Sequence, residues 1–210
     1  MVEVGGVVIC GGQSRRMGQP KAWLDFGGEL LLRRIVRRLR GAVSPVVVVG
    51  APGQALPSLP EDVERVDDQR LGWGPLEALR VGLAAVGPRR DAAFVCGCDA
   101  PFVMPEYIPV LREWLGDAEV AVVADEQWEY PLLGLYRTRV HDPIEQMIAN
   151  GLRRPRDIFS RVVTRRVPTS VFLEVDPRRL ALVNVNDPND YCAALQIADP
   201  WRLPTPGCDA

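Results

Sequence analysis

Short, continuous runs of apolar residues constrain the fold of this chain more than any other feature of its sequence. The runs are rich in valine, as in the VVVV of residues 46–49. An unbroken apolar run of this length is typical of a β-strand that is buried on both faces, as strands are in parallel sheets. We expect seven such strands, at residues 4–10, 46–49, 63–66, 92–96, 120–124, 132–136 and 182–185.

Stretches with helical periodicity separate most of these runs. In residues 29–40, apolar side chains recur at helical spacing and arginines occupy the opposite face. Residues 75–86 begin with a proline, which favours a first helical turn, and end before a Gly-Pro pair. We also expect helices at residues 105–115, 139–150 and 188–197. Alternating strands and helices predict an α/β fold with a doubly wound, mostly parallel, Rossmann-like sheet.

Length and composition limit the architecture and the partners. The 210 residues, of which 47% are hydrophobic, suit one domain, which we expect over residues 1–198 with a flexible tail at 199–210. A net charge of -2 argues against a generally basic nucleic-acid binder, and no apolar run is long enough to span a membrane. Five cysteines without zinc-type spacing, together with no evident signal peptide, predict a cytoplasmic protein. We expect neither nucleic acid nor a membrane as a partner.

The segment CGGQSRRMGQPK at residues 10–21 directly follows the first predicted strand. Gly11 and Gly12 remove the Cβ atoms that would keep a phosphate away from the backbone, and bent consecutive amides form an anion-binding nest. Arg16 and Lys21 supply mobile positive charge beside it. The alternative is an ordinary glycine turn with solvated arginines. The combination of strand, paired glycines and cations favours a phosphate site at the carboxyl edge of the sheet.

Acidic and amide side chains also follow predicted strands. Asp99 comes after the strand at residues 92–96, where a carboxylate suits Mg²⁺, which takes one or two protein carboxylates together with phosphate oxygens. Asp67 and Asp68 end another strand and could accept hydrogen bonds from a nucleotide base or ribose; spacing does not choose between them. Asn184 and Asn186 alternate with a valine, so both point to one face and suit a polar substrate. Caps and turns are the competing interpretation of each.

Six segments, in order along almost the whole chain, resemble the molybdenum cofactor guanylyltransferases (MobA type) of the nucleotidyltransferase family. Each segment alone is a weak signal, but their order makes the resemblance specific. The segments are the loop at residues 10–21, DDQ at 67–69 with GPL at 74–76, CDAPF at 98–102, YPLLGLY at 130–136, GLRR at 151–154 and NVNDP at 184–188.

The resemblance implies a reaction. GMP is transferred from GTP to the terminal phosphate of molybdopterin, free or loaded with molybdenum, and pyrophosphate leaves. An ionised phosphate attacks, so no general base is needed, and positioning and charge carry the catalysis. It also implies roles: catalysis by Arg16, Lys21 and Asp99; nucleotide binding by Ile9, Cys10, Gly11, Gly12, Lys21, Asp67, Asp68, Gly74 and Asp99; Mg²⁺ binding by Asp99; and acceptor binding by Arg153, Arg154, Asn184 and Asn186.

Departures from the family pattern keep alternatives open. Tyr130 replaces the usual histidine or glutamine, which puts the substrate contact of that segment in doubt, and Gln19-Pro20-Lys21 is as close to the cytidylyltransferases that act on the same pterin with CTP. A non-catalytic nucleotide-binding paralogue is a second alternative. A third is a structural partner in molybdoenzyme maturation, with residues 201–210 as a docking segment for molybdoenzymes or their chaperones. The arginines at 33, 34, 37 and 38 are interpreted as a solvated helix face.

Overall fold

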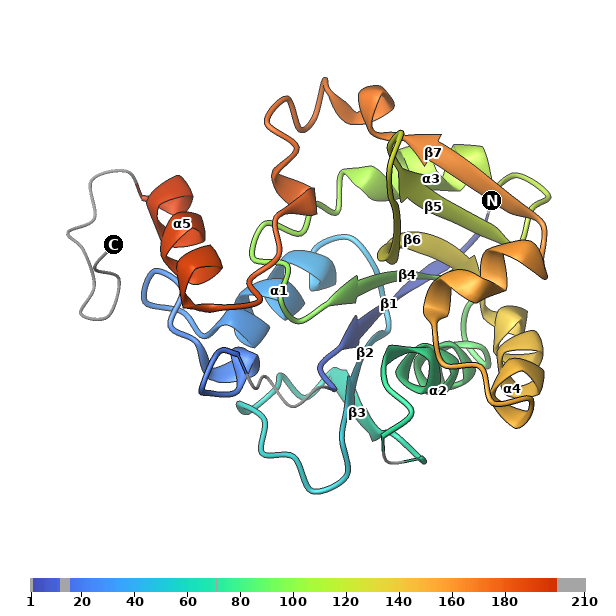
Figure 1. Ribbon diagram of the computed structural model, residues 1–210, viewed down its shortest axis with the longest axis horizontal. Helices are drawn as coiled ribbons and strands as arrows, with labels where there is room; N and C mark the ends of the chain where they lie inside the picture. Colours follow the sequence, from blue (N-terminus) through green and yellow to red (C-terminus); the bar gives the residue numbers. More distant parts are fainter. Residues whose placement is uncertain (1, 12–15, 71, 200–210) are drawn as a thin grey trace.

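The computed structural model describes residues 2–11, 16–70 and 72–199, and its central feature is one seven-stranded sheet (Figure 1). The strands lie in the order β3-β2-β1-β4-β6-β5-β7. Each of β1, β2, β4 and β5 is buried along its whole length, as its apolar sequence predicts. The strands are β1 (Val4–Ile9), β2 (Val46–Gly50), β3 (Val63–Asp67), β4 (Ala92–Gly97), β5 (Val120–Ala124), β6 (Glu129–Arg137) and β7 (Thr164–Pro168).

The sheet is mixed but mostly parallel, so the predicted α/β, Rossmann-like class is confirmed. The strands β1, β2, β3 and β4 run parallel to one another, and β5 runs parallel to β7. Only β6 runs antiparallel to both of its neighbours, β4 and β5. The carboxyl ends of β1 and β4 therefore lie side by side at one edge of the sheet, where open α/β folds bind ligands.

The strand predicted at residues 182–185 is wrong. The seventh strand is instead β7, which pairs in parallel with β5 at the edge of the sheet. Only Val167 of β7 is buried and its arginines face solvent, so the segment carries no continuous apolar signal. The apolar run after residue 180 begins as a short 3-10 helix, and Val185 is fully buried with its amide hydrogen-bonded to the Asp99 carbonyl oxygen at 2.8 Å. That run packs under the site rather than in the sheet.

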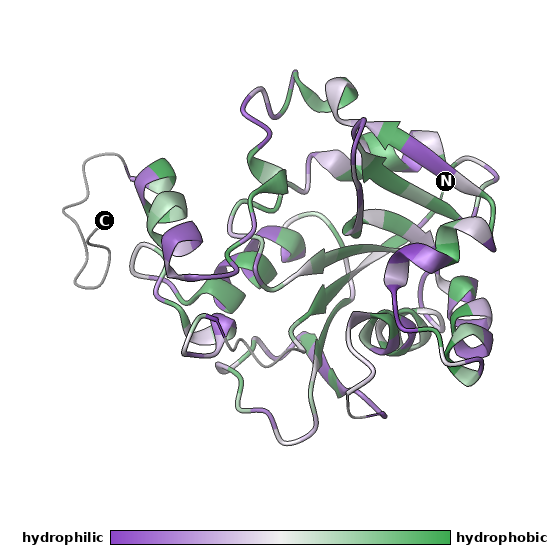
Figure 2. Ribbon diagram, in the orientation of Figure 1, coloured by the Kyte–Doolittle hydropathy of each residue, from purple (hydrophilic) through white to green (hydrophobic). Residues whose placement is uncertain are grey.

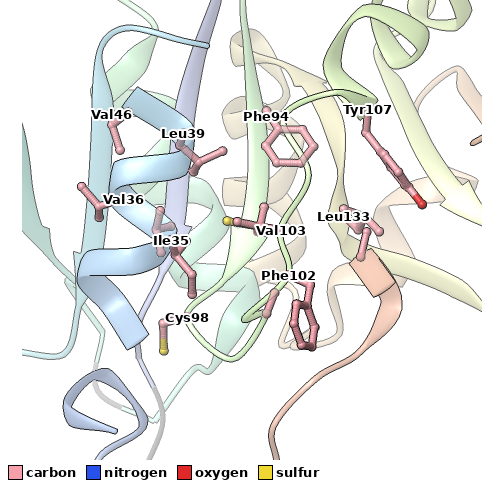
Figure 3. Close-up of a cluster of buried hydrophobic side chains, with 14 of the residues drawn as sticks. Ile35, Val36, Leu39, Val46, Phe94, Cys98, Phe102, Val103, Tyr107 and Leu133 are labelled. Carbon is pink, nitrogen blue, oxygen red and sulfur yellow. The ribbon is translucent and has the colours of Figure 1, made fainter. Parts of the chain in front are cut away.

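Helices cover both faces of the sheet, and each layer has its own core. The arrangement appears in Figure 1, and Figure 2 shows the apolar strands between the layers. Figure 3 shows Ile35, Val36 and Leu39 of the first helix among the buried side chains of one core. The helices are α1 (Leu31–Arg40), α3 (Tyr107–Leu115) and α5 (Pro188–Ala198), which contribute to that core, and α2 (Pro75–Val86) and α4 (His141–Ala149), which contribute to the other.

Three of the five predicted helices begin two residues later than expected. These are α1, α3 and α4; α4, for example, is preceded by the 3-10 turn Thr138–Val140. Within the described parts of the chain, no helix combines the length and the apolar character needed to cross a membrane. Of the tail predicted at residues 199–210, only Asp199 is among the described residues.

Candidate functional site

The predicted phosphate loop and the predicted metal ligand leave the sheet side by side. Ile9 and Gly97 are paired in register, and the Cys98 amide donates to the Ile9 carbonyl oxygen at 2.9 Å. The Cys10 amide donates to the Val49 carbonyl oxygen at 2.7 Å, so the backbone stays hydrogen-bonded to β2 at the start of the loop. Gly11 follows directly, whereas the predicted site residue Gly12 lies outside the described residues.

Lys21 joins three segments that are far apart in the sequence. Its Nζ atom donates to Asp99 Oδ2 at 3.0 Å and to Asn186 Oδ1 at 2.9 Å. The side chain of Lys21 is 15% exposed and that of Asp99 27% exposed, so the ion pair is partly shielded but open to a ligand. Three residues predicted to act on a nucleotide or acceptor therefore meet at one point. Arg16 is an exposed turn residue of the same loop.

Backbone packing fixes the carboxylate of Asp99. A Cβ atom on Gly97 would lie 2.3 Å from Asp99 Oδ1, so only glycine leaves room for this side-chain position. The carbonyl oxygen of Asp99 is held by the Val185 amide, which lies between the two asparagines predicted for the site. Both asparagines are exposed while Val185 is buried, as the predicted alternation requires.

Arginines of α1 hold the loop that follows β4. Arg34 Nε donates to the Pro101 carbonyl oxygen at 2.9 Å, and Arg38 Nε donates to the Val103 carbonyl oxygen at 2.6 Å. Arg34 also lies over the ring of Phe26, with 5.1 Å between the guanidinium carbon and the ring centre. The prediction of a purely solvated arginine face is therefore wrong for Arg34 and Arg38, which support the backbone around the candidate metal ligand.

The structure separates the two aspartates between which spacing could not choose. Asp67 is exposed and accepts a hydrogen bond from Arg65 Nε at 2.9 Å. Asp68 is half-buried and faces the phosphate loop, since a Cβ on Gly11 would lie 3.2 Å from its Oδ2. Its Oδ1 is buried without a hydrogen-bond partner among the described residues. Burial, with added repulsion from Glu77 and Asp67, raises the pKa of Asp68 to about 6. Asp68 is thus the better placed acceptor for a ligand.

Gln54 is a contact of the site that sequence reasoning missed. Its Nε2 donates to the Cys10 carbonyl oxygen at 3.1 Å, and its Oε1 accepts from the Ala51 amide at 2.8 Å. The side chain thereby ties the loop after β2 to the start of the phosphate loop. A glutamine in a loop rich in proline and glycine carries no motif, so no sequence signal could have identified this role.

The predicted residues Gly74, Arg153 and Arg154 lie on the α2 side of the site. Gly74 has a φ of +70°, which favours glycine, and it is the N-cap of α2. The Arg153 guanidinium carbon lies 4.6 Å from the ring centre of Trp73, and its Nη1 donates to the Gly72 carbonyl oxygen at 3.3 Å. Arg154 is exposed. Arg153 therefore contacts the segment that follows Asp68, and acceptor binding by this pair stays a prediction.

A cavity of about 200 Å³ opens beside Asp99. The hydroxyl of Tyr130, at one wall, donates to Asp125 Oδ2 at 2.5 Å, and burial together with this carboxylate raises the pKa of Tyr130 to about 12. Tyr130 is therefore a neutral phenol at physiological pH. Apolar and polar side chains both line the cavity: the lining includes Asp99, Ala100, Val103, Glu129, Tyr130, Pro131, Leu132, Leu133 and Asn184.

The oxygen ligands around Asp99 fit a magnesium ion that is bound by the protein together with the phosphate oxygens of a substrate. In the described ranges, no three histidine, cysteine, aspartate or glutamate side chains form a metal cluster. Asp99 offers one carboxylate, and the amide oxygen of Asn186 accepts a hydrogen bond from the same Lys21 Nζ atom. Mg²⁺ keeps several waters and takes one or two carboxylates together with phosphate oxygens, so a single carboxylate beside a phosphate loop is sufficient.

Comparisons with known proteins identify the family of this chain. A family model described as MobA-like NTP transferase domain matches residues 6–166. A probable molybdenum cofactor guanylyltransferase of Mycobacterium avium (strain 104) is 35% identical over 200 residues, which cover 93% of this chain and 96% of the relative. The corresponding protein of Mycobacterium tuberculosis (strain H37Rv) is 40% identical over 158 residues, covering 73% of this chain and 77% of that protein.

A solved structure shares the fold. The crystal structure of molybdopterin-guanine dinucleotide biosynthesis protein A from Archaeoglobus fulgidus superposes with a TM-score of 0.79 at 21% identity, covering 94% of this chain and 99% of that one. The match of the family model to most of the chain, and the identity to the mycobacterial relatives over most of their length, decide the assignment. The chain belongs to the MobA-like NTP transferase family and is a nucleotidyltransferase.

Proposed function

We propose that the protein transfers GMP from GTP to the terminal phosphate of molybdopterin, with or without bound molybdenum, and releases pyrophosphate. The observation that carries the proposal is the contact of Lys21 with both Asp99 and Asn186, because it joins the phosphate loop, the candidate metal ligand and the candidate acceptor side. The names of the mycobacterial relatives support the choice of nucleotide and acceptor. We place the reaction in the cytoplasm, where GTP is available.

The nucleotide lies, in this proposal, across the ends of β1 and β4. Its phosphates approach the backbone from Ile9 to Gly12, where glycines leave the amides accessible. Its base lies over Gly11 and is recognised by Asp68. Guanine presents two adjacent donors, N1–H and the N2 amino group, and a carboxylate with an unused, buried oxygen suits both. Asp67 is exposed and paired with Arg65, which makes it the weaker candidate.

The chemistry needs positioning and charge rather than a protein base. An oxygen of the acceptor phosphate forms a bond to the α-phosphorus, and the bond from that phosphorus to the pyrophosphate oxygen breaks. The attacking oxygen is already ionised near neutral pH, so no proton has to be removed. Lys21 stabilises the charge that develops on the phosphates, and the exposed Arg16 adds positive charge at the mouth of the loop.

Asp99 would hold the Mg²⁺ ion, and the amide oxygen of Asn186 would accept from water bound to it. When bound, the ion neutralises charge on the phosphate oxygens. In the structure Lys21 balances the charge of Asp99. The ion pair with Lys21 and the close packing against Gly97 together hold the Asp99 carboxylate in place.

The acceptor lies on the opposite side of Asp99 from the nucleotide. The cavity beside Asp99 is lined by apolar side chains that suit a flat ring and by polar side chains, among them Asn184 and Glu129. The hydroxyl of Tyr130 is engaged by Asp125, so this tyrosine offers its ring face rather than a free polar group to the cavity. Arg153 and Arg154 remain predicted acceptor contacts.

A nucleotide panel tests the proposal. Purified protein is incubated with Mg²⁺, molybdopterin and either GTP, CTP, ATP or ITP, and both pyrophosphate release and the pterin dinucleotide are measured. We expect GTP to exceed CTP by at least about tenfold in kcat/KM, because a site with buried acceptors rejects a base that leaves them unpaired. A preference for CTP would instead favour the resemblance of Gln19-Pro20-Lys21 to the pterin cytidylyltransferases.

A further inference from the structure

A fully buried carboxylate, that of Glu77, lies in the first turn of α2, three residues after the N-cap Gly74. Glu77 has no exposed surface, and Arg80 binds both of its oxygens, with Nε to Oε2 and Nη2 to Oε1 each at 2.8 Å. Burying a charge is costly unless it is paired and hydrogen-bonded. The bidentate contact satisfies that requirement and fixes the plane of the Arg80 guanidinium.

A second arginine extends the pair into a network of alternating charges. Arg70 Nη1 lies 3.4 Å from Glu77 Oε2, and the Arg70 guanidinium binds both oxygens of Glu145 at 3.1 and 2.5 Å. Arg80 Nε also lies 3.1 Å from Glu145 Oε2. Glu145 belongs to α4, which lies beside α2 in Figure 1. The network therefore connects two helices with the loop that contains Arg70.

That loop follows the residue proposed to read the base. We call residues 68–70 the base segment. Arg80 Nη2 donates to Gln69 Oε1 at 2.8 Å, so two consecutive side chains of the base segment, those of Gln69 and Arg70, are bound by the network. The Asp68 amide is fixed on the other side, since it donates to the Gly50 carbonyl oxygen at 2.8 Å. Asp68 thus lies between its backbone hydrogen bond to β2 and the residues that the buried charge network binds.

We propose that Glu77 is a positioning residue for base recognition: through Arg70 and Arg80 it holds the base segment so that the Asp68 carboxylate faces the ligand over Gly11. The proposal rests on the proposed function, because it assumes that Asp68 accepts from guanine. Glu77 is fully buried, so it does not itself touch the nucleotide. Its effect is therefore on the discrimination between bases and not on the phosphate site.

Stability alone does not explain a network of this kind. A buried ion pair adds little net stability compared with well-packed apolar side chains of similar volume, because desolvation offsets the attraction. What a bidentate arginine pair does supply is a fixed geometry, since each guanidinium is held in one plane. The network supplies that geometry to the side chains of Gln69 and Arg70, next to a half-buried carboxylate that has an unused oxygen.

The test compares three ligands on the variant Glu77→Gln, which keeps the side-chain volume. Dissociation constants are measured by calorimetry for GTP, for ITP, which lacks the N2 amino group, and for pyrophosphate, which contains no base. We expect the Kd for GTP to rise about tenfold, as for the loss of a well-aligned hydrogen bond. The preference for GTP over ITP should fall towards one, and the Kd for pyrophosphate should stay within about twofold.

Asp176→Asn is the matched control. Asp176 is also buried, at 1% exposure, and its carboxylate accepts from the Tyr107 hydroxyl and from the Leu180 and Ala181 amides in the other layer of the molecule. This variant should lose stability and keep the GTP preference. An equal loss of GTP and pyrophosphate binding in Glu77→Gln, or an unchanged GTP-to-ITP ratio, would overturn the proposal.

A second variant covers the case in which Glu77→Gln does not fold. Arg70→Met removes the link between the base segment and Glu145 while Arg80 still pairs with Glu77, and Arg70 is 37% exposed, so the fold should tolerate the change. The same fall in the GTP-to-ITP ratio is expected, and its absence contradicts the proposal. If the wild-type protein itself shows no preference for GTP over ITP or CTP, the proposed function fails instead, which the wild-type panel reveals separately.

Discussion

Replacing Asp68 by asparagine should stabilise the free protein and weaken GTP binding at the same time. Burial raises the pKa of Asp68 from 3.8 to about 6, with further contributions from Glu77 and Asp67. At about 1.36 kcal/mol per pKa unit, this rise corresponds to about 3 kcal/mol of destabilisation of the ionised form. Because Asp68 is only half-buried, solvent screening should reduce the effect to about 1–2 kcal/mol.

The stabilisation by Asp68→Asn should depend on pH. The folded protein binds the Asp68 proton more tightly than the unfolded chain, so this carboxylate lowers the stability of the wild type as the pH rises from about 4 to about 6. Asp68→Asn lacks this loss. Its free energy of unfolding in urea should therefore exceed that of the wild type by about 1–2 kcal/mol at pH 8, and by only a few tenths at pH 4.

The same substitution should cost affinity for the nucleotide. Asparagine replaces one carboxylate oxygen with a donor that faces the donors of guanine, so the Kd for GTP at pH 8 should rise at least about tenfold. Below pH 6 the wild-type affinity should fall faster than that of the variant, because only the wild type must lose a proton from residue 68 to bind. A stability difference that is the same at pH 4 and pH 8, or GTP affinities that change in parallel with pH, would refute the reasoning.

Further substitutions test the other parts of the site. Asp99→Ala should reduce kcat by at least two orders of magnitude at an unchanged fold, since one strong charge-stabilising element contributes about 3–4 kcal/mol, and wild-type turnover would remove Asp99 from the mechanism. Gly97→Ala places a Cβ atom 2.3 Å from Asp99 Oδ1 and should lower kcat at least tenfold by displacing that carboxylate. Gly41→Ala is the control: the atom nearest to its added Cβ is the Arg38 carbonyl oxygen at 3.5 Å, so its kcat should equal that of the wild type. Lys21→Met should lower both GTP affinity and turnover while the melting temperature changes by only a few degrees, because an ion pair with partly exposed partners contributes about 1 kcal/mol or less; a fully unfolded variant would show that Lys21 supports the fold instead.

Local sequence was sufficient for the features that depend on chain direction and burial. The valine-rich runs determined four strands that are buried along their whole length, and a glycine or an aspartate directly after such a run must lie at the carboxyl edge of the sheet. Gly11 and Asp99 could therefore be assigned to one edge from their positions alone. The edge strand β7 was not predicted, because only Val167 of its five residues is buried and the segment therefore has no apolar pattern.

Only the tertiary structure decided how these residues are used. Asp67 and Asp68 are adjacent and chemically identical in the sequence; the fold leaves one in solvent beside Arg65 and turns the other toward Gly11, which raises its pKa. The contact of Lys21 with Asn186 spans 165 residues. The sequence by itself determined which residue types stand at the ends of the strands, because that depends on local periodicity. Desolvation and pairing are set by groups that are distant along the chain, so the choice of Asp68, the role of Gln54 and the charge network of Glu77 required the folded molecule.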